Sequence, residues 1–596
     1  MNRNESMKKT EPLSFNFQLL TQFINIDYLC EKIVSYMTKT ELRKRTRARE
    51  SSNAIERLYI TMRHLLNRGF YKPFGVSGNT LKQGLLTLRP EIYGDVATDK
   101  SELNGLKYVM DRLPEGIEEC HVIYMTDDEG YRSSQFKPII PPKRRRHCYR
   151  IDKDQMNVEL TRGRSDVYDI LTHLTFLFIE SHKIREKAVI DKEGTPGREW
   201  QALEKVVLEH KKLKKAETER IIAYLSTLLG RTFEETKQAY KEFKEPDNPN
   251  RFFQLIYWLG KLALDEAYLG KKRIIKFSPR LRERLGHHVY GEIWASNIKK
   301  HLQKQGLLQR PIHIISSNMH SVLNVLFAQK ALKTDKGDMA LYKELSQDQH
   351  QNMRDKVTKL AEKNGVVYLK DRSGANIDVQ IFDTAKFKNA DLPESFYQQH
   401  DTKKPVLIVM DYAFGEQAFE VMDELLKPYE ENGKKEHLNV QSISIMGKAG
   451  ILVGDKGDIM IPKVHMFEGT ADNYPIENEL SINDFETEDI NVYEGTMVTV
   501  LGTSLQNKDI LSFFKNSTWR AIGLEMEGAH YQKAIQSASK IRGNIDASVK
   551  VRYAYYASDN PLQTGSTLAS GPLGVKGVEP TYIITKKILQ QVFKTK

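Results

Sequence analysis

The stretch VLIVMDYAFGEQAFEVMDELL, residues 406–426, decides how the second half of this sequence folds. Its first five residues are all apolar, which is typical of a strand buried on both faces of a sheet. A short turn and a helical segment follow, so Glu416 stands where a strand gives way to a helix. Functional groups in open α/β sheets gather at the carboxyl ends of strands, and Glu416 is therefore a candidate site residue.

Short apolar runs of the same kind recur from about Arg310 onward. The segment RPIHIISSNMHSVLNVLFAQKAL predicts a strand followed by a helix, and further strands are predicted at GVVYL, IDVQIFD, QSISIMG, GDIMIP, GTMVTVLG and VRYAYYAS. Strands that alternate with helices favour a mostly parallel or mixed sheet covered on both faces. We expect an α/β domain over residues 401–596, with residues 301–400 as an α/β segment leading into it.

Residues 1–300 have a different pattern. Apolar residues at three- and four-residue spacing predict helices over residues 15–37 and 164–190. Between these helices, residues 120–154 carry alternating and β-branched runs around a DDEG turn, which predicts a small antiparallel β insert. We expect a large, mainly helical N-terminal region whose role the sequence does not reveal.

Composition bounds the possible partners. The 596 residues imply more than one domain, and 90 Lys and Arg against 78 Asp and Glu give a net charge of +12. Such a balance suits a nucleic acid or a phosphorylated small molecule. No stacking-aromatic module or DNA-binding motif is present, so we do not expect nucleic acid as a partner. We interpret the basic runs at residues 40–50, 141–150 and 210–220 as solvated helix faces.

The remaining composition argues against several classes of protein. Three scattered cysteines form no C-x-x-C pair and predict neither a disulfide framework nor a cysteine zinc site. His173, Glu180 and His182 lack metal-binding H-E-x-x-H spacing, so we expect structural roles for them, no metal and no cofactor. No apolar run is long enough to span a bilayer and no secretory signal opens the chain, which predicts a cytoplasmic protein without a membrane partner.

Two more segments place polar groups at predicted strand ends. The run IMGKAGILVGDKGDIMIP follows a strand, and its glycines, including Gly447 and Gly450, allow the backbone to approach a ligand closely. The strand VRYAYYA leads into Ser558 and Asp559. Each feature alone also fits a structural role, as a turn or as a helix cap.

The motif EMEG adds Glu525, Met526 and Glu527 where a helix is predicted to start. The glutamates could be first-turn acids that the helix dipole favours. The order of all these motifs along one α/β domain is harder to obtain by chance than any one of them.

From about Val406 to the end, this order resembles the purine nucleoside phosphorylase and nucleosidase superfamily, and within it the AMP nucleosidases. The resemblance is carried by VLIVMDYAFGEQ, IMGKAGILVGDKGDIMIP, EGTADNYP, EGTMVTVLGTS, EMEGA and SDNPL. The segment SDNPLQTGSTLASGPLG, residues 558–574, looks like the one that follows the catalytic aspartate of AMP nucleosidases. The resemblance implies a nucleoside phosphorylase-like fold and a homo-oligomer.

The resemblance also implies roles for individual residues. Asp559 would protonate the purine base at N7 with Ser558 orienting it, a task that suits a carboxyl in a desolvated pocket. Glu527 would accept hydrogen bonds from the ribose hydroxyls, with Met526 packing on the sugar and Glu525 as the preceding acid. Glu416 would activate water.

Two departures from the superfamily pattern bear on the substrate. The phosphorylases carry an arginine where this chain has Ile445, and Lys448 replaces the usual serine between Gly447 and Gly450. The first departure disfavours phosphate as the nucleophile, whereas Lys448 could hold a 5′-phosphate or point to solvent.

We therefore expect hydrolysis of AMP to adenine and ribose 5-phosphate. The alternatives are a phosphorylase or nucleosidase acting on unphosphorylated nucleosides, and a purine nucleotide sensor without catalysis.

Overall fold

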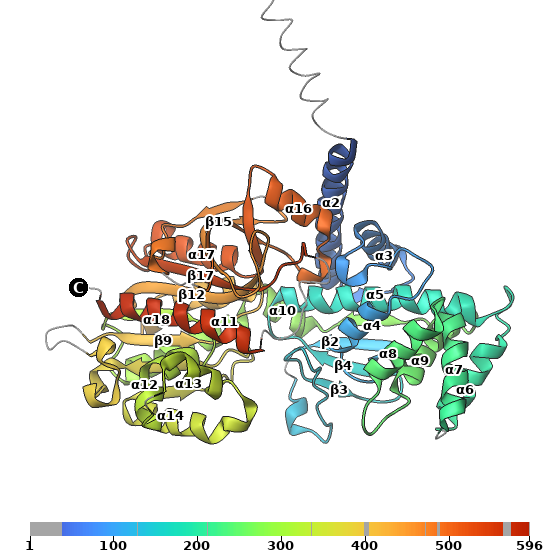
Figure 1. Cartoon of the computed structure of the whole chain (residues 1–596), viewed down its shortest axis with the longest axis horizontal. Coiled ribbons are helices and arrows are strands. Elements are labelled where there is room, and N and C mark those ends of the chain that lie inside the picture. Colours follow the sequence, from blue (N-terminus) through green and yellow to red (C-terminus); the bar gives the residue numbers. More distant parts are fainter. Residues whose placement is uncertain are drawn as a thin grey trace, which may run out of the picture.

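The structure is a computed structural model that describes residues 39–594 except 128, 211–212, 335, 398–403, 471, 486–488 and 564–573. The helix expected over residues 15–37 lies outside the described residues, as does most of the segment after Asp559 that resembles AMP nucleosidases. Figure 1 shows the C-terminal sheet with its helices beside an N-terminal part that has a sheet of its own.

The C-terminal part is built on a ten-stranded mixed sheet, which confirms the expected α/β class. The strand order is β14-β13-β15-β16-β12-β6-β9-β8-β7, and β17 pairs with β12 and β13. The strands are β6 (Ile312–Ser316), β7 (Val366–Leu369), β8 (Val379–Asp383), β9 (Val406–Met410), β12 (Val440–Ile451), β13 (Ile459–Phe467), β14 (Asn473–Pro475), β15 (Val492–Thr499), β16 (Ala521–Glu525) and β17 (Lys550–Asp559). The hairpin β10 (Tyr429–Glu431) and β11 (Lys434–Glu436) stands apart.

Five of these strands close on themselves. The parallel pairs are β12 with β17, β13 with β15 and β15 with β16, and antiparallel pairs join β13 to β17 and β16 to β12. The circuit leaves none of the five as a free edge, which is how barrels remove exposed strand edges. Strand β12 also pairs with β6, so it belongs to both the circuit and the open part of the sheet.

Alternate residues of the central strands pack on opposite faces. In β9, Leu407 and Val409 join the cluster formed with α12 and α18, whereas Ile408 and Met410 join the one formed with α11, α15 and α17. Burial on both faces accounts for the unbroken apolar runs in the sequence. The helices of this part are α12 (Ser321–Leu332), α13 (Asp338–Leu345), α14 (Gln351–Lys363), α15 (Gln417–Leu425), α16 (Lys508–Asn516), α17 (Gly528–Gln536) and α18 (Val578–Lys594).

Residues 301–400 supply β6, β7 and β8 to the ten-stranded sheet and so share it with residues 401–596. The expected boundary near residue 300 falls inside α11 (Val289–Lys304), which packs against α15. None of the helices in the described part of the chain is both long and apolar enough to cross a bilayer.

The N-terminal part surrounds α5, which is buried along most of its length. Its helices are α2 (Lys39–Arg68), α3 (Val76–Leu88), α4 (Leu103–Met110), α5 (Arg164–Ala188), α6 (Arg198–Leu208), α7 (Lys215–Leu229), α8 (Phe233–Phe243), α9 (Arg251–Tyr268) and α10 (Pro279–Gly286). The buried residues of α5 include Asp166, His173 and Glu180 as well as many apolar side chains, so this helix runs through the middle of the N-terminal part.

The β insert is larger than the sequence indicates. Strands β2 (Val122–Thr126), β3 (Cys148–Arg150) and β4 (Gln155–Glu159) join β1 (Phe70–Tyr71) and β5 (Ile274–Phe277) in one sheet of order β1-β5-β2-β4-β3. The expectation of a small antiparallel element is wrong, because β2 pairs in parallel with both β4 and β5.

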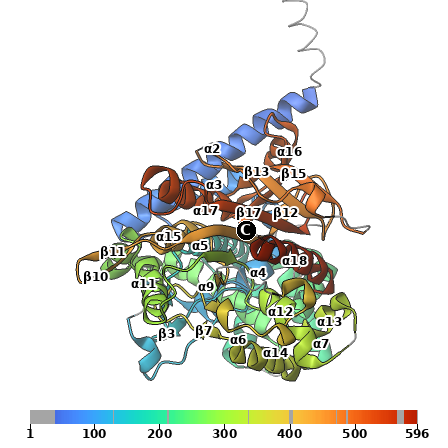
Figure 2. The same cartoon turned by 90° about the vertical axis from the view of Figure 1, so that its left-hand side faces the viewer.

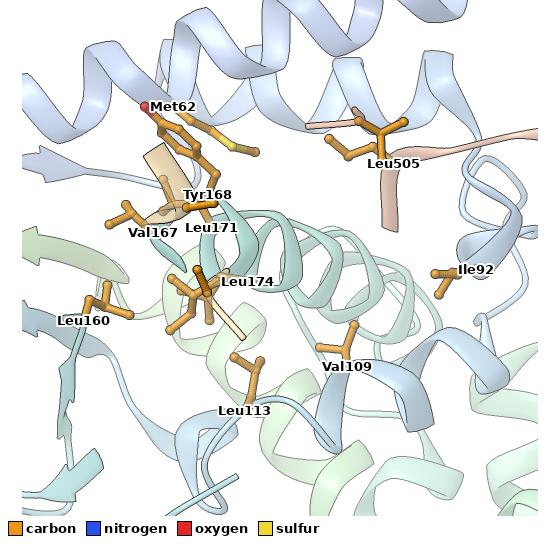
Figure 3. Close-up of a cluster of buried hydrophobic side chains, with 14 of the residues drawn as sticks. Met62, Ile92, Val109, Leu113, Leu160, Val167, Tyr168, Leu171, Leu174 and Leu505 are labelled. Carbon is orange, nitrogen blue, oxygen red and sulfur yellow. The ribbon is translucent and has the colours of Figure 1, made fainter. Parts of the chain in front are cut away.

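Helix α2 joins the two parts. Figures 1 and 2 show it running past α16, and Asn507 donates hydrogen bonds of 2.8 Å to Ser51 Oγ and to the Leu88 carbonyl. Figure 3 shows Met62 of α2, Tyr168 of α5 and Leu505 among the buried apolar side chains where the parts meet. One hydrophobic cluster therefore extends through both parts.

A second junction lies where α5 begins. The Glu416 backbone N–H donates to Ser165 Oγ at 2.9 Å, and the Gly415 N–H donates to Glu527 Oε1 at 2.9 Å. Gly415 has φ +56°, and a Cβ at this position would lie 2.4 Å from Ser165 Oγ. Both the conformation and the close approach require glycine.

We predict that Gly415→Ala destabilises the fold by about 2–4 kcal/mol, because a strained φ adds to an overpacked contact. The matched control is Gly433→Ala, since Gly433 also has positive φ (+77°) but open space at its Cβ. That variant should lose only about 1 kcal/mol. Denaturant unfolding of both proteins gives the comparison, and equal losses would contradict the contact with Ser165.

Candidate functional site

A cavity of about 800 Å³ opens at the carboxyl ends of the C-terminal strands. Residues at the ends of β6, β16 and β17 line it, together with the second half of β12. The N-terminal part supplies the opposite wall through residues 140–147 and the start of α5. The cavity therefore belongs to both parts of the chain.

Asp559 ends β17 with its carboxyl in this cavity. Ser558 Oγ donates a 2.6 Å hydrogen bond to Asp559 Oδ1, and the other oxygen, Oδ2, is buried without a hydrogen-bond partner. Burial raises the pKa of Asp559 to about 6, against the opposing effects of Ser558, Lys448 and Lys456. A carboxyl in this state can hold a proton near neutral pH.

Glu525 and Glu527 are close to each other but are placed differently. The carboxylate of Glu525 accepts from Thr499 Oγ1 and from the N–H groups of Glu527 and Gly528, and it thereby caps α17. Burial, followed by the charge of Glu527, raises the pKa of Glu525 to about 8. Because its oxygens are occupied by the protein, Glu525 positions its neighbours rather than offering a free acceptor.

Glu527 precedes the first turn of α17 and lines the cavity. Burial raises its pKa, while the hydrogen bond from Gly415 and the charges of Arg162 and Lys448 lower it. Met526 lies between the two glutamates and also lines the cavity. The structure thus brings Glu525, Met526, Glu527, Ser558 and Asp559 to one place.

The glycine-rich run differs from the sequence prediction. The strand predicted at QSISIMG does not end at Gly447, because β12 continues to Ile451 and Lys448 is a strand residue. Pairing with β17 as far as Gly450 keeps the chain extended. Gly447, Lys448, Gly450 and Ile445 all line the cavity, with the Lys448 side chain exposed.

Glu416 is not brought together with the other candidates. It precedes the first turn of α15 as expected, but it is absent from the residues lining the cavity. Its Oε1 lies 3.2 Å from Arg164 Nη1, so the carboxylate faces the start of α5. A role in activating water would require this ion pair to open.

The sequence prediction missed the N-terminal wall of the cavity. Residues 141–150, interpreted as a solvated helix face, instead form an irregular segment that ends in β3, and Arg146 is only 2% exposed. Pairing with Asp166 and Asp169 compensates its burial. The basic run itself was the available signal, whereas nothing in the sequence pointed to Arg162.

His173, Glu180 and His182 have separate partners. His173 Nε2 lies 3.5 Å from Asp169, the Glu180 carboxylate accepts from Lys183 at 2.6 Å, and His182 Nε2 lies 3.0 Å from Glu186. Among the residues that the structure describes, no group of three His, Cys, Asp or Glu side chains could hold a metal ion.

The raised pKa of Asp559 makes a prediction about stability. Its pKa is 3.8 ordinarily and about 6 in the fold. The stability that the neutral carboxyl contributes to the fold is therefore fully present below pH 3.8 and is lost as pH rises through 6. Asp559→Asn should therefore be more stable than the unmodified protein at pH 7, by about 2–3 kcal/mol. The gain should shrink toward pH 4. A gain that does not vary between pH 4 and 7, measured by denaturant unfolding, would contradict the burial of this charge.

Several solved structures are similar to part of the chain. A 5′-methylthioadenosine/S-adenosyl homocysteine nucleosidase from Campylobacter jejuni has 12% identity and a TM-score of 0.29, over 48% of this chain and 100% of its own. A futalosine hydrolase mutant from Helicobacter pylori strain 26695 has 13% identity and a TM-score of 0.28, over 48% and 100%. A uridine phosphorylase from Schistosoma mansoni in complex with thymidine has 11% identity and a TM-score of 0.28, over 50% and 88%.

No curated protein matches the chain. A family model, described as a family of unknown function (DUF6909), matches residues 79–342 and 338–594. These two segments include most of the residues that line the cavity. The chain belongs to this family of unknown function.

Proposed function

We propose that this protein is a hydrolase that cleaves the N-glycosidic bond of a purine nucleotide, converting AMP and water into adenine and ribose 5-phosphate. The observation that carries the proposal is the pair Asp559 and Glu527 in one cavity, one carboxyl poised to hold a proton and the other set to accept hydrogen bonds. The motif order that resembles AMP nucleosidases supplies the substrate class.

The proposed reaction begins with the proton of Asp559. Transfer to N7 of the base makes the purine a leaving group, and the C1′–N9 electron pair departs with it. Positive charge then develops on the sugar, as in glycoside hydrolysis. Glu527 would accept from the ribose hydroxyls and stabilise this charge.

Water completes the proposed reaction. Its hydroxyl bonds to C1′, and its remaining proton restores the acid form of Asp559, so the protein returns to its starting state. Ile445 offers no charge to an attacking phosphate, which favours water as the nucleophile. The cavity of about 800 Å³ falls within the usual size of small-molecule sites.

We predict that Asp559→Asn lowers the rate of adenine release from AMP by about 100- to 10,000-fold, the usual contribution of general acid catalysis. Glu525→Gln is a useful comparison, because the Glu525 oxygens accept hydrogen bonds from backbone N–H groups of the protein. Replacing Glu525 should therefore act only through the position of Glu527. Chromatographic detection of free adenine at saturating AMP is the measurement.

Near-normal turnover by Asp559→Asn would exclude the proposed acid. Tight binding of AMP by the unmodified protein without any base release would instead favour a nucleotide sensor.

A second prediction concerns Lys448, whose charge lowers the pKa of both Asp559 and Glu527 and which we propose as a contact for the substrate phosphate. Lys448→Ala should lower kcat/KM for AMP about tenfold and leave adenosine nearly unchanged, because one charge-assisted contact is lost. Lys456→Ala is the control, since Lys456 also lowers the pKa of Asp559 but does not line the cavity. An AMP-to-adenosine ratio unchanged in Lys448→Ala would remove this lysine from the phosphate site.

A further inference from the structure

The N-terminal wall of the cavity holds an unbalanced cluster of charges. Four guanidinium groups and two carboxylates meet between β3 and the first two turns of α5, and they are Arg112, Arg144, Arg146, Arg162, Asp166 and Asp169. All of these residues except Asp166 line the cavity, and all six lie outside the part of the chain that resembles the nucleosidases.

Both carboxylates are engaged by two of the arginines. Asp169 accepts from Arg144 Nε at 2.9 Å and Arg144 Nη2 at 2.8 Å, and also from Arg146 Nη2 at 2.6 Å. Arg146 Nε donates to Asp166 Oδ1 at 2.8 Å. Such bidentate and shared pairs can offset the desolvation of Arg144 and Arg146.

Arg162 has no such compensation. It is only 9% exposed, and its Nε is buried without a hydrogen-bond partner. Its guanidinium lies 5.1 Å from the centre of the Phe414 ring, and no ion pair joins it to an acid among the described residues. Burial lowers its pKa, Asp166 raises it, and Arg144, Arg145 and Arg146 lower it further.

Arg112 is partly exposed, and no ion pair joins it to an acid among the described residues. Its Nη1 donates to the Tyr108 carbonyl at 2.8 Å, its guanidinium lies 3.4 Å from the centre of the Tyr108 ring, and its Nε is buried without a hydrogen-bond partner. Burial lowers the pKa of Arg112 and the charge of Arg144 lowers it as well, whereas Tyr108 and Asp169 raise it. A buried cation without an ion pair is costly, so Arg162, with Arg112 lining the same cavity, indicates a ligand that supplies negative charge.

The position of Arg162 in the cavity suggests which end of a nucleotide it meets. Its guanidinium lies 5.1 Å from the centre of the Phe414 ring, and the next residue along the chain, Gly415, donates its N–H to Glu527 Oε1. Arg162 therefore lies on the Glu527 side of the site. In a nucleotide the phosphate and the base project from opposite ends of the sugar.

We propose that Arg162 and Arg112 form an anion-binding subsite for the phosphate group of the substrate, supplied by the N-terminal part of the chain. A phosphate monoester carries a charge of about −1.5 to −2 at pH 7, which two guanidinium groups without ion pairs can balance. The planar forks of arginine suit phosphate oxygens. The identity of the rest of the substrate rests on the proposed function, but the subsite itself does not.

Phosphate binding can be measured without any reaction. Inorganic phosphate should bind the full-length protein in titration calorimetry and raise its melting temperature, and Arg162→Met should weaken binding at least tenfold. Arg112→Met should have the same direction of effect. Lys300→Met, which removes one charge from the exposed face of α11, should leave binding unchanged.

Stability provides a second readout. Without phosphate, Arg162→Met should melt at a higher temperature than the unmodified protein, because the variant no longer buries an unpaired cation. With phosphate present, this difference in melting temperature should narrow or reverse, because phosphate stabilises the unmodified protein more than the variant. Unchanged phosphate affinity in both Arg162→Met and Arg112→Met would overturn the subsite.

Activity separates this proposal from the function on which it builds. If the protein hydrolyses AMP, Arg162→Met should lower the AMP-to-adenosine ratio of kcat/KM at least tenfold, and an unchanged ratio would overturn the subsite while leaving the hydrolase. If no nucleotide is hydrolysed but phosphate binding still depends on Arg162, the subsite stands and the proposed function fails.

Discussion

The site depends on one backbone hydrogen bond, from the Gly415 N–H to Glu527 Oε1 at 2.9 Å. The same short segment places Glu416 N–H on Ser165 at the start of α5. The carboxylate at the start of α17 and the N-terminal part are therefore held by adjacent peptide groups. Only glycine satisfies both the positive φ of residue 415 and its approach to Ser165.

The cavity contains charges of both signs in unfavourable states. Burial raises the pKa of Asp559 and Glu525 and lowers the pKa of Arg162 and Arg112. Each shift is a cost to the folded protein, and several such costs in one cavity are typical of a functional site. The continuous hydrophobic cluster through both parts can offset them.

The sequence predicted those features that depend on short stretches of chain. Strands β9 and β17 end where unbroken apolar runs stop, so Asp559 could be placed at a strand end, and Glu525 and Glu527 could be placed at the start of a helix. The continuation of β12 to Ile451 could not be predicted, because Gly447 and Gly450 are poor strand residues that pairing with β17 holds in place. The ion pair between Glu416 and Arg164 is also a tertiary contact that the local sequence does not reveal.

The N-terminal wall was beyond prediction for a different reason. A basic run in sequence does not reveal its carboxylate partners, and Arg146 is buried only because Asp166 and Asp169 come from α5. The strand pairing of β2 with β5, across about 150 residues, is equally invisible to local patterns. The sequence thus identified candidate catalytic groups, whereas the fold shows what surrounds them.

Hydrolysis of the C1′–N9 bond by water is the central claim, and oxygen labelling tests it most directly. The protein would be incubated with AMP in H₂¹⁸O, and the sugar product analysed by mass spectrometry before the label exchanges. We predict release of adenine together with ribose 5-phosphate that carries one ¹⁸O at C1′. Unlabelled sugar, a 1-phosphate formed from added phosphate, or intact AMP would contradict the account.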